Sequence, residues 1–314
     1  MFLRLVSFSL VLAAATLSVR GAIERSVEKT FPISKGGCFK IDTRQGVIRV
    51  EASPDDKIHL LLREAMDIDN QLDADKRLED LLLNIDAQEA QVSLQARFRK
   101  GLRWGWQSWP PVALTFEVKL PRGCLLDVKT AEGNVTVGPL ESAVRISASN
   151  GTIFTGEVSG PLSIESTRGD VSVTACKGEL NIRANSGNVL VGRAYGTTKI
   201  FGTSGLIEVQ NALGHLQIDA DGADVKVGFA RSAKEAAELK AFGGDIEVVF
   251  DTRGAFTIDA SSSRFGQVKT KALPLSIESG KAGSPRVIGT LNGGGPFIKI
   301  DSSGGNVRLV GRES

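Results

Sequence analysis

The chain has 314 residues, 41% of them hydrophobic, and 38 basic against 36 acidic side chains give it a formal charge of +2. This near balance excludes the strongly basic surface that nonspecific nucleic-acid binding requires, so no nucleic-acid partner is expected. Glycine is abundant, with 35 residues, whereas aromatic residues make up only 6% of the chain. Such a composition is typical of many short strands joined by tight turns.

The N-terminal segment predicts export. Arg4 precedes an apolar run over residues 5–17, and small or polar residues follow as far as Gly21. A cationic start, a short apolar stretch and small residues at a cleavage site are typical of a secretory signal peptide. We therefore predict a signal peptide over 1–21 and a mature chain over 22–314 that is periplasmic, on the cell surface or extracellular. The alternative is an uncleaved anchor, which the length of the run disfavours because crossing a bilayer takes about 20 residues.

The most informative pattern is a glycine repeat. One set of glycines recurs at a fixed interval of 18 residues, and a second set repeats the interval half a period later. A fixed short period with a turn residue at each corner is typical of a solenoid, in which each repeat buries its apolar face against its neighbours. The first set is Gly133, Gly151, Gly169, Gly187 and Gly205, and the second is Gly160, Gly178, Gly196 and Gly214.

Apolar residues alternate on both sides of each glycine of the first set, as in Leu162 and Ile164 before Gly169 and Val171 and Val173 after it. Period-two alternation predicts strands with one buried face and one wet face. The sequence thus predicts an all-β fold, a parallel β-solenoid of two-strand coils, as a single domain over 22–314. Regular repeats cover 124–230 and C-terminal coils cover 244–311. Residues 39–50 and 298–309 match the same template, so the solenoid is expected to begin and end with the same unit.

Two segments interrupt the period. Residues 55–123 predict a small α+β insert, with a strand over 58–62, a helix over 71–83 and two further strands through 92–98 and 112–120. We expect it to pack over the first coil and hide its open end, because exposed solenoid ends invite edge pairing. Residues 231–243 predict one inserted surface helix, because Ser232 and Glu235 form a capping box and Gly243 is suited to a C-cap.

Polar residues follow the repeat glycine at Asn134, Asp170 and Asn188, and Asp224 follows Ala223, which stands in the place of the glycine. Asn and Asp tolerate turn conformations and hydrogen-bond their own turn, which predicts a structural role. The alternative is a calcium ladder, but one acid or amide per corner offers too few oxygens. We therefore expect no metal and no cofactor. The tripeptide over 168–170, which spells an integrin-binding motif, is interpreted as ordinary repeat sequence because its glycine belongs to the ladder.

The three cysteines are an odd number for an oxidising compartment. Cys124 takes the corner position of the second glycine set, and Cys38 lies in a near-equivalent place of an earlier coil, so a Cys38–Cys124 disulfide is our hypothesis. Cys176 falls where other coils carry Leu or Ala, which predicts a buried apolar role.

Several motifs together resemble a bacterial putative-adhesin family of unknown function. They are the start over 31–43, the helix-bearing insert, the entry Leu-Pro-Arg-Gly over 120–123, the serial S-x-x-G-x-V/I coils and the closing segments over 293–298 and 302–307. The resemblance spans roughly residues 26–311, and relatives of the family include head domains of proposed autotransporter adhesins. It implies an exported β-solenoid and supplies no catalytic residues.

Catalytic motifs are scarce. His59 and His215 are the only histidines, and neither has a cysteine or second histidine at metal-ligand spacing. The sequence contains no nucleophile elbow and no phosphate-binding loop. The expectation is a protein that is not an enzyme, although a carbohydrate-active enzyme with paired carboxylates stays open as an alternative.

The tryptophans form the sharpest candidate site. All three lie within residues 99–111, beside several cations, and the candidate ligand-binding residues are Arg99, Lys100, Arg103, Trp104, Trp106 and Trp109. Exposed indoles bind sugar faces or membrane headgroups, and cations favour anionic partners. The alternative is that the tryptophans pack against the solenoid end. We predict a non-catalytic exported envelope or surface protein of adhesin-like type, whose partner is an envelope glycan, a lipid or another envelope protein. The alternative function is lipid or anionic-glycan binding through 99–111.

Overall fold

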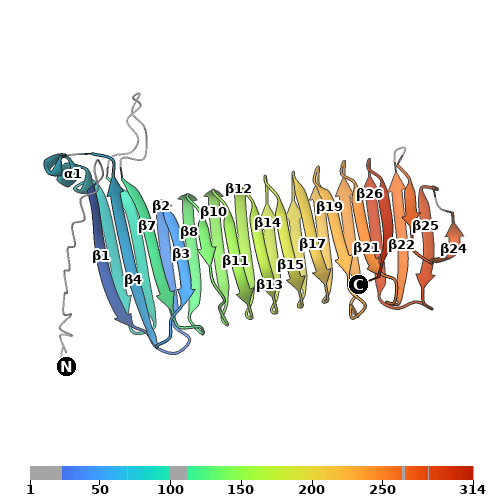
Figure 1. Cartoon of the computed structure of the whole chain (residues 1–314), viewed down its shortest axis with the longest axis horizontal. Coiled ribbons are helices and arrows are strands. Elements are labelled where there is room, and N and C mark those ends of the chain that lie inside the picture. Colours follow the sequence, from blue (N-terminus) through green and yellow to red (C-terminus); the bar gives the residue numbers. More distant parts are fainter. Residues whose placement is uncertain (1–22, 69, 100–111, 264–265, 282, 314) are drawn as a thin grey trace, which may run out of the picture.

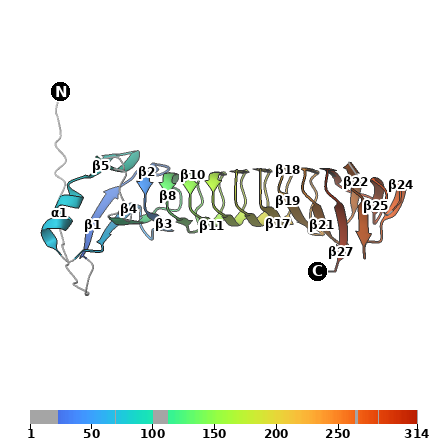
Figure 2. The same cartoon turned by 90° about the horizontal axis from the view of Figure 1, so that it is seen from above.

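The structure is a computed structural model that describes residues 23–68, 70–99, 112–263, 266–281 and 283–313. The molecule is elongated, and its strands lie across the long axis like rungs (Figure 1). Seen from above, the strands form two layers that face each other along the middle of the molecule (Figure 2). Each layer is one continuous sheet, of 13 and 14 strands. No helix among the described residues has the length and apolarity needed to cross a bilayer.

The strands of the 13-stranded sheet are, in spatial order, β1 (Ile23–Pro32), β4 (Lys57–Met66), β7 (Ala113–Leu120), β3 (Val47–Ala52), β9 (Val135–Val137), β11 (Ile153–Val158), β13 (Val171–Cys176), β15 (Val189–Ala194), β17 (Leu206–Ala212), β19 (Asp224–Phe229), β21 (Ile246–Asp251), β27 (Val307–Arg312) and β23 (Val268–Lys271). Those of the 14-stranded sheet are β24 (Ser276–Gly280), β25 (Arg286–Leu291), β22 (Phe256–Ser263), β26 (Phe297–Ser303), β20 (Ala237–Phe242), β18 (Leu216–Asp221), β16 (Thr198–Gly202), β14 (Leu180–Ala184), β12 (Leu162–Arg168), β10 (Val144–Asn150), β8 (Leu125–Glu132), β2 (Cys38–Gln45), β6 (Gln91–Phe98) and β5 (Leu81–Gln88).

The central coils confirm the predicted solenoid. Each coil gives one strand to each sheet, and equivalent residues of successive coils pair in parallel, as Leu162 does with Leu180 and Val171 with Val189. The alternating valines, isoleucines and leucines of both sheets point inward and are buried, so the core lies between the sheets along the molecule. Cys176 is fully buried in this core, as its repeat position predicted.

Steric constraints explain the first glycine set. These five glycines have φ between 94° and 125°, a range that side chains rarely adopt. At Gly169 a Cβ atom would lie 2.1 Å from the carbonyl oxygen of Gly151, the equivalent glycine of the preceding coil. Both the backbone angle and the close stacking of coils therefore require glycine at this corner.

The corner amides and acids connect coils, which corrects their predicted role. Their side chains do not close their own turn but accept a hydrogen bond from a backbone N–H of the next coil. Asn134 Oδ1 accepts from Thr152, Asp170 from Asn188, and Asn188 from Leu206, at distances of 2.7–3.0 Å. The acid of the integrin-like tripeptide is thus one member of an inter-coil ladder.

The N-terminal insert extends both sheets. β7 pairs in parallel with β3 and β6 with β2, and antiparallel strands β4, β1 and β5 complete the sheet ends. The expectation that the insert packs over the first coil is therefore wrong for its strands. Only helix α1 (Gln71–Leu78) lies at the end of the core, where Ala74 is buried (Figure 2). The predicted helix over 71–83 is too long, because residues from Leu81 onward pair with β6.

The helix predicted over 231–243 is wrong. Residues 237–242 form strand β20, in which Ala237, Leu239 and Ala241 are buried and pair with Leu216, Ile218 and Ala220 of β18. The period is locally longer than 18 residues, because a longer turn precedes the strand. Pairing within the sheet overrides the local capping signal of Ser232 and Glu235.

The order of the coils in space departs from their order in the chain at the C-terminal end. β26 and β27, the last strands in the sequence, lie between β20 and β21 on one side and β22 and β23 on the other. The antiparallel strands β25 and β24 follow β22 and close the 14-stranded sheet. The template match over 298–309 is thus confirmed as a coil, but that coil is internal.

Candidate functional site

The predicted tryptophan-rich site lies almost wholly outside the described residues. Of its members only Arg99 is described. Its side chain is exposed, and its backbone N–H donates to the Asp80 carbonyl over 2.7 Å. Lys100, Arg103, Trp104, Trp106 and Trp109 fall within residues 100–111, so ligand binding through this segment stays a prediction.

The structure brings Cys38 and Cys124 close together but does not bond them. Cys38 pairs in register with Leu125, the residue that follows Cys124. All three cysteines are free thiols, so the predicted Cys38–Cys124 disulfide is absent. Burial raises the pKa of the Cys124 and Cys176 thiols to about 11, and it also raises the pKa of the half-buried Cys38.

We expect the thiols to react in the order of their exposure. At pH 8 only Cys38 of the native protein should react with Ellman's reagent, and its reaction should be slow. Cys124 and Cys176 should react only after denaturation, because a buried thiol with a raised pKa holds little thiolate. A Cys38→Ser variant should remove the native-state reaction. Fewer than three reactive thiols in denatured, unreduced protein would show that a disulfide forms after all.

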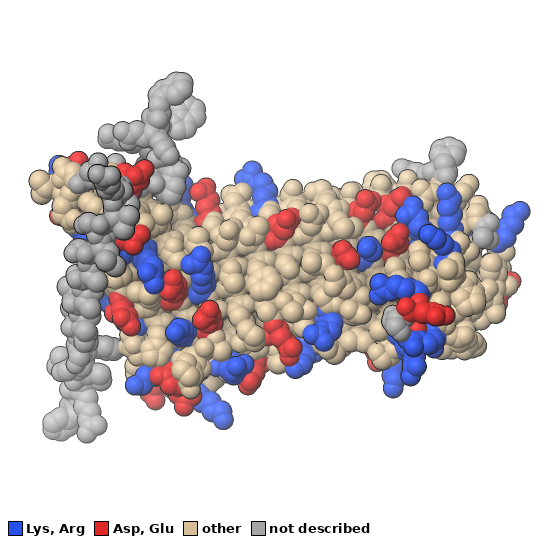
Figure 3. All heavy atoms as spheres, in the orientation of Figure 1, with Lys and Arg blue, Asp and Glu red and all other residues tan. Residues whose placement is uncertain are grey.

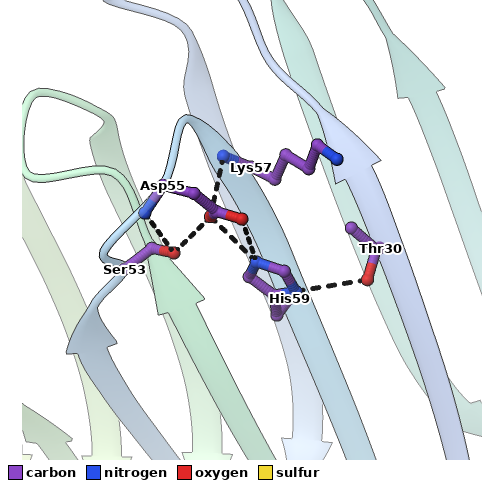
Figure 4. A network of polar contacts seen from close by, with 5 residues as sticks. All are labelled: Thr30, Ser53, Asp55, Lys57 and His59. Atoms are coloured by element: carbon purple, nitrogen blue, oxygen red, sulfur yellow. Dashed lines mark hydrogen bonds and ion pairs between the residues drawn. The ribbon is translucent and has the colours of Figure 1, made fainter.

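His59 takes part in the clearest polar network of the described residues (Figure 4). Its ring Nε2 lies 2.9 Å from Oδ1 of Asp55, and Nδ1 lies 3.2 Å from Oγ1 of Thr30 on the neighbouring strand β1. The Ser53 hydroxyl donates to Asp55 over 2.7 Å, and the Lys57 backbone N–H donates to the same carboxylate. The hydrogen bonds from Ser53, His59 and Lys57 lower the pKa of Asp55 to about 2.

This network does not activate a nucleophile. In a serine hydrolase the histidine lies between serine and acid, where it withdraws the proton of the serine hydroxyl. Here Asp55 lies between Ser53 and His59, and the Ser53 hydroxyl donates a hydrogen bond to the Asp55 carboxylate. Because the pKa of Asp55 is low, this carboxylate is a weak base and does not withdraw the hydroxyl proton. The arrangement therefore fixes the loop between β3 and β4 against β1, and it supplies no catalytic dyad.

A cavity of about 630 Å³ opens beside this network. Loops 33–36, 53–56 and 121–124 surround it together with Glu141, and its wall carries both signs of charge, from Lys35, Arg122, Asp55, Asp56 and Glu141. Sequence reasoning missed this site because the loops are far apart in the chain. The signal was present, since 31–37 and 120–123 are two of the segments that carry the family resemblance. Among the described residues, no three His, Cys, Asp or Glu side chains are arranged to hold a metal ion.

The outer face of the 13-stranded sheet is sparsely charged at its middle. Figure 3 shows few charged side chains there and more toward both ends. Along one outward row Phe154, Ser172 and Leu190 are neighbours in register, and Phe154 is 45% exposed. The next strands of that row carry Glu208 and Lys226, which form an ion pair of 3.6 Å.

His215, the second histidine, lies at a corner of the 14-stranded sheet. Its carbonyl accepts a hydrogen bond from the backbone N–H of Thr198 over 2.8 Å, and its side chain enters no hydrogen bond or ion pair with another described residue. It therefore does not join His59 in a common site.

Several solved structures align with most of this chain at low sequence identity. Solved structures of similar topology include a putative adhesin of Bacteroides fragilis, with 14% identity over 92% of this chain and 97% of that chain and a TM-score of 0.44. A putative adhesin of Parabacteroides merdae has 10% identity over 90% and 95%, with a TM-score of 0.39. A putative lipid-binding protein of Parabacteroides distasonis has 12% identity over 90% and 96%, with a TM-score of 0.38. No protein with a curated description matches the chain.

The sequence profile of one family matches residues 39–310, which include all the regular coils, the insert and both of the coils nearest the termini. The match agrees with the resemblance found in the sequence motifs. The chain belongs to the Toastrack DUF4097 family.

Proposed function

We propose that this protein is a non-catalytic, exported protein of the cell envelope or cell surface, with an adhesin-like role in which the outer faces of the solenoid bind a partner. The observation that carries the proposal is the exact register of the central coils, which holds outward side chains in straight rows on both faces. Such rows form a long, rigid and repetitive surface, which suits a partner that is itself extended.

The site chemistry favours binding over catalysis. A glycosidase needs two carboxyl groups facing each other across a cleft, one of them with a raised pKa. Of the acids around the 630 Å³ cavity, Asp55 is held by Ser53 and His59, and its pKa is lowered. Export rests on the predicted signal peptide over 1–21, whose removal leaves a mature chain of formal charge zero, because Arg4 and Arg20 are lost.

The test is export followed by envelope binding. The full chain, expressed in its own cells, should be recovered outside the cytoplasm with Ala22 as its first residue, and the purified mature chain should co-sediment saturably with envelope fractions. A Trp104→Ala/Trp106→Ala/Trp109→Ala variant maps the contribution of the tryptophan-rich segment: undiminished binding by a folded variant excludes it. Retention of unprocessed chain in the cytoplasm, or absence of saturable binding, would overturn the proposal.

A further inference from the structure

Two shallow hollows lie on the outer face of the 14-stranded sheet. The larger, of about 440 Å³, covers β2, β8, β10 and β12, and the smaller, of about 190 Å³, covers β14, β16 and β18. Asn181 of β14 lines both, so the two hollows adjoin, and together they cover seven consecutive strands. At about 4.8 Å between strands this row of hollows is roughly 29 Å long, and it follows the solenoid axis. We call it the sheet groove.

The charged side chains of the sheet groove differ from those elsewhere on the same face. Toward the C-terminal end, Glu238 pairs with Lys240 over 2.9 Å and with Lys299 over 3.6 Å, and Arg286 pairs with Asp259 over 2.8 Å. At this end of the face the positive and negative charges therefore neutralise one another in ion pairs.

In the sheet groove, by contrast, the side chains of Arg145, Arg183 and Lys199 make no hydrogen bond or ion pair with any residue in the described part of the chain. Four cations line the groove, Lys40, Arg145, Arg183 and Lys199, against the two lining acids Asp127 and Asp219, and a third acid, the exposed Glu165 of β12, is the register neighbour of Arg183. The groove therefore keeps an excess of positive charge that a ligand carrying spaced negative charges would neutralise.

One aromatic ring and two amides complete the groove. Phe201 on β16 is 38% exposed and lies in register between Arg183 on β14 and Asp219 on β18. An exposed ring face packs against the C–H face of a pyranose. Asn181 and Gln217 offer both donors and acceptors for hydroxyl groups, and guanidinium groups bind carboxylates by charge-assisted hydrogen bonds.

We propose that the sheet groove binds a linear acidic polysaccharide, a chain of pyranose units that carry carboxylate groups. The inference rests on the proposed function and names its ligand class. The sheet groove is long, straight and shallow, which suits an extended chain. Its ring suits the C–H faces of the pyranose units, its amides suit the hydroxyl groups, and its cations suit the carboxylate groups. Nucleic acid fits less well, because duplex DNA carries one negative charge per roughly 1.7 Å and four cations with three neighbouring acids would neutralise little of it.

The experiment measures binding of the purified mature chain to three acidic polysaccharides, polygalacturonate, alginate and hyaluronan, by affinity electrophoresis and calorimetry. Binding to at least one is expected, with affinity that falls as salt rises. Affinity should also grow with oligosaccharide length until the groove is filled. Methyl esterification of the bound polysaccharide's carboxylates should weaken binding strongly, because it removes the charges that Arg183 and Lys199 would contact.

Variants locate the site. Phe201→Ala and Arg183→Gln/Lys199→Gln should each weaken binding on the order of tenfold, the change that a lost ring contact or charge pair produces. Phe154→Ala is the matched control, because it removes an exposed ring from the opposite sheet, and it should bind like the parent. Circular dichroism and thermal melting verify that each variant is folded.

Each adverse outcome has a distinct meaning. Binding to none of the three polysaccharides, with envelope binding intact, overturns the ligand class and leaves the proposed function standing. Weakening by Phe154→Ala but not by Phe201→Ala overturns the groove and places binding on the other face. Equal affinity for the methyl ester overturns the role of the cations. Loss of both export and envelope binding is a failure of the proposed function itself.

Discussion

A Gly169→Ala substitution is expected to leave the chain largely unfolded at room temperature or to lower its melting temperature severely. The new Cβ would lie 2.1 Å from the carbonyl oxygen of Gly151, and the backbone at Gly169 has a φ of 121°. The backbone of the neighbouring coil cannot move aside, because each coil is hydrogen-bonded on both sides. We expect a loss on the order of 3 kcal/mol or more in the free energy of unfolding, measured by urea titration.

Gly123→Ala is the matched control for this prediction. Gly123 has no atom within 4 Å of the position that its Cβ would take, and its φ lies outside the range that excludes side chains. Its stability should stay within about 1 kcal/mol of the parent, since a glycine-to-alanine change without strain acts mainly on the unfolded chain. Equal melting temperatures for the two variants would contradict the steric account of the ladder.

A Phe250→Ala substitution is expected to cost about 3–5 kcal/mol of stability, the usual penalty for emptying a buried aromatic site. Phe250 is fully buried, and its ring centroid lies 5.6 Å from that of Phe229 and 5.1 Å from that of Phe256. The three rings fill the core where the regular coils meet the C-terminal ones, so a cavity there also weakens the contact between these two parts. Chemical denaturation followed by circular dichroism gives the loss directly.

Phe154→Ala serves as the comparison for Phe250→Ala because the Phe154 ring is 45% exposed on an outer face. Its removal should change stability by less than about 1 kcal/mol. A second, earlier transition in the Phe250→Ala unfolding curve would show that the C-terminal coils separate first. A Phe250→Ala variant as stable as Phe154→Ala would contradict the packing described for the three rings.

The coil could be predicted from the sequence because its two signals reinforce each other. The glycine interval and the period-two alternation around Gly169 place every inward side chain of the central coils, and Cys176 follows from the same count. The helix predicted over 231–243 is wrong because it rests on a capping pattern alone. Ser232, Glu235 and Gly243 resemble helix caps, but Leu239 and its neighbours complete a sheet, and pairing of this kind is a long-range property that a local window does not contain.

The candidate sites were less predictable for a related reason. The cavity beside His59 is enclosed by loops 33–36, 53–56 and 121–124, which the topology of the insert brings together. The charged residues of the sheet groove are outward positions, and each of them alone looks like an ordinary solvated residue. The side chains of Arg183 and Lys199 differ from those of Lys240 and Lys299 because they form no ion pair. Whether a cation forms an ion pair depends on which residues the neighbouring coils place beside it, and this is not visible in the local sequence.

The placement of the final coil limits how this architecture changes in length. β26 and β27 lie between strands that precede them in the sequence, and β2 and β3 lie between the insert strands β6 and β7 on one side and β8 and β9 on the other. The first and last coils of the described chain are therefore both flanked on each side, whereas β1 forms an edge of the 13-stranded sheet. Deleting residues 297–312 would remove an interior coil and leave β22 without its parallel partner β26. We therefore expect whole repeats to be gained or lost within the central block, in steps of one coil, because each coil there pairs in parallel with two like neighbours.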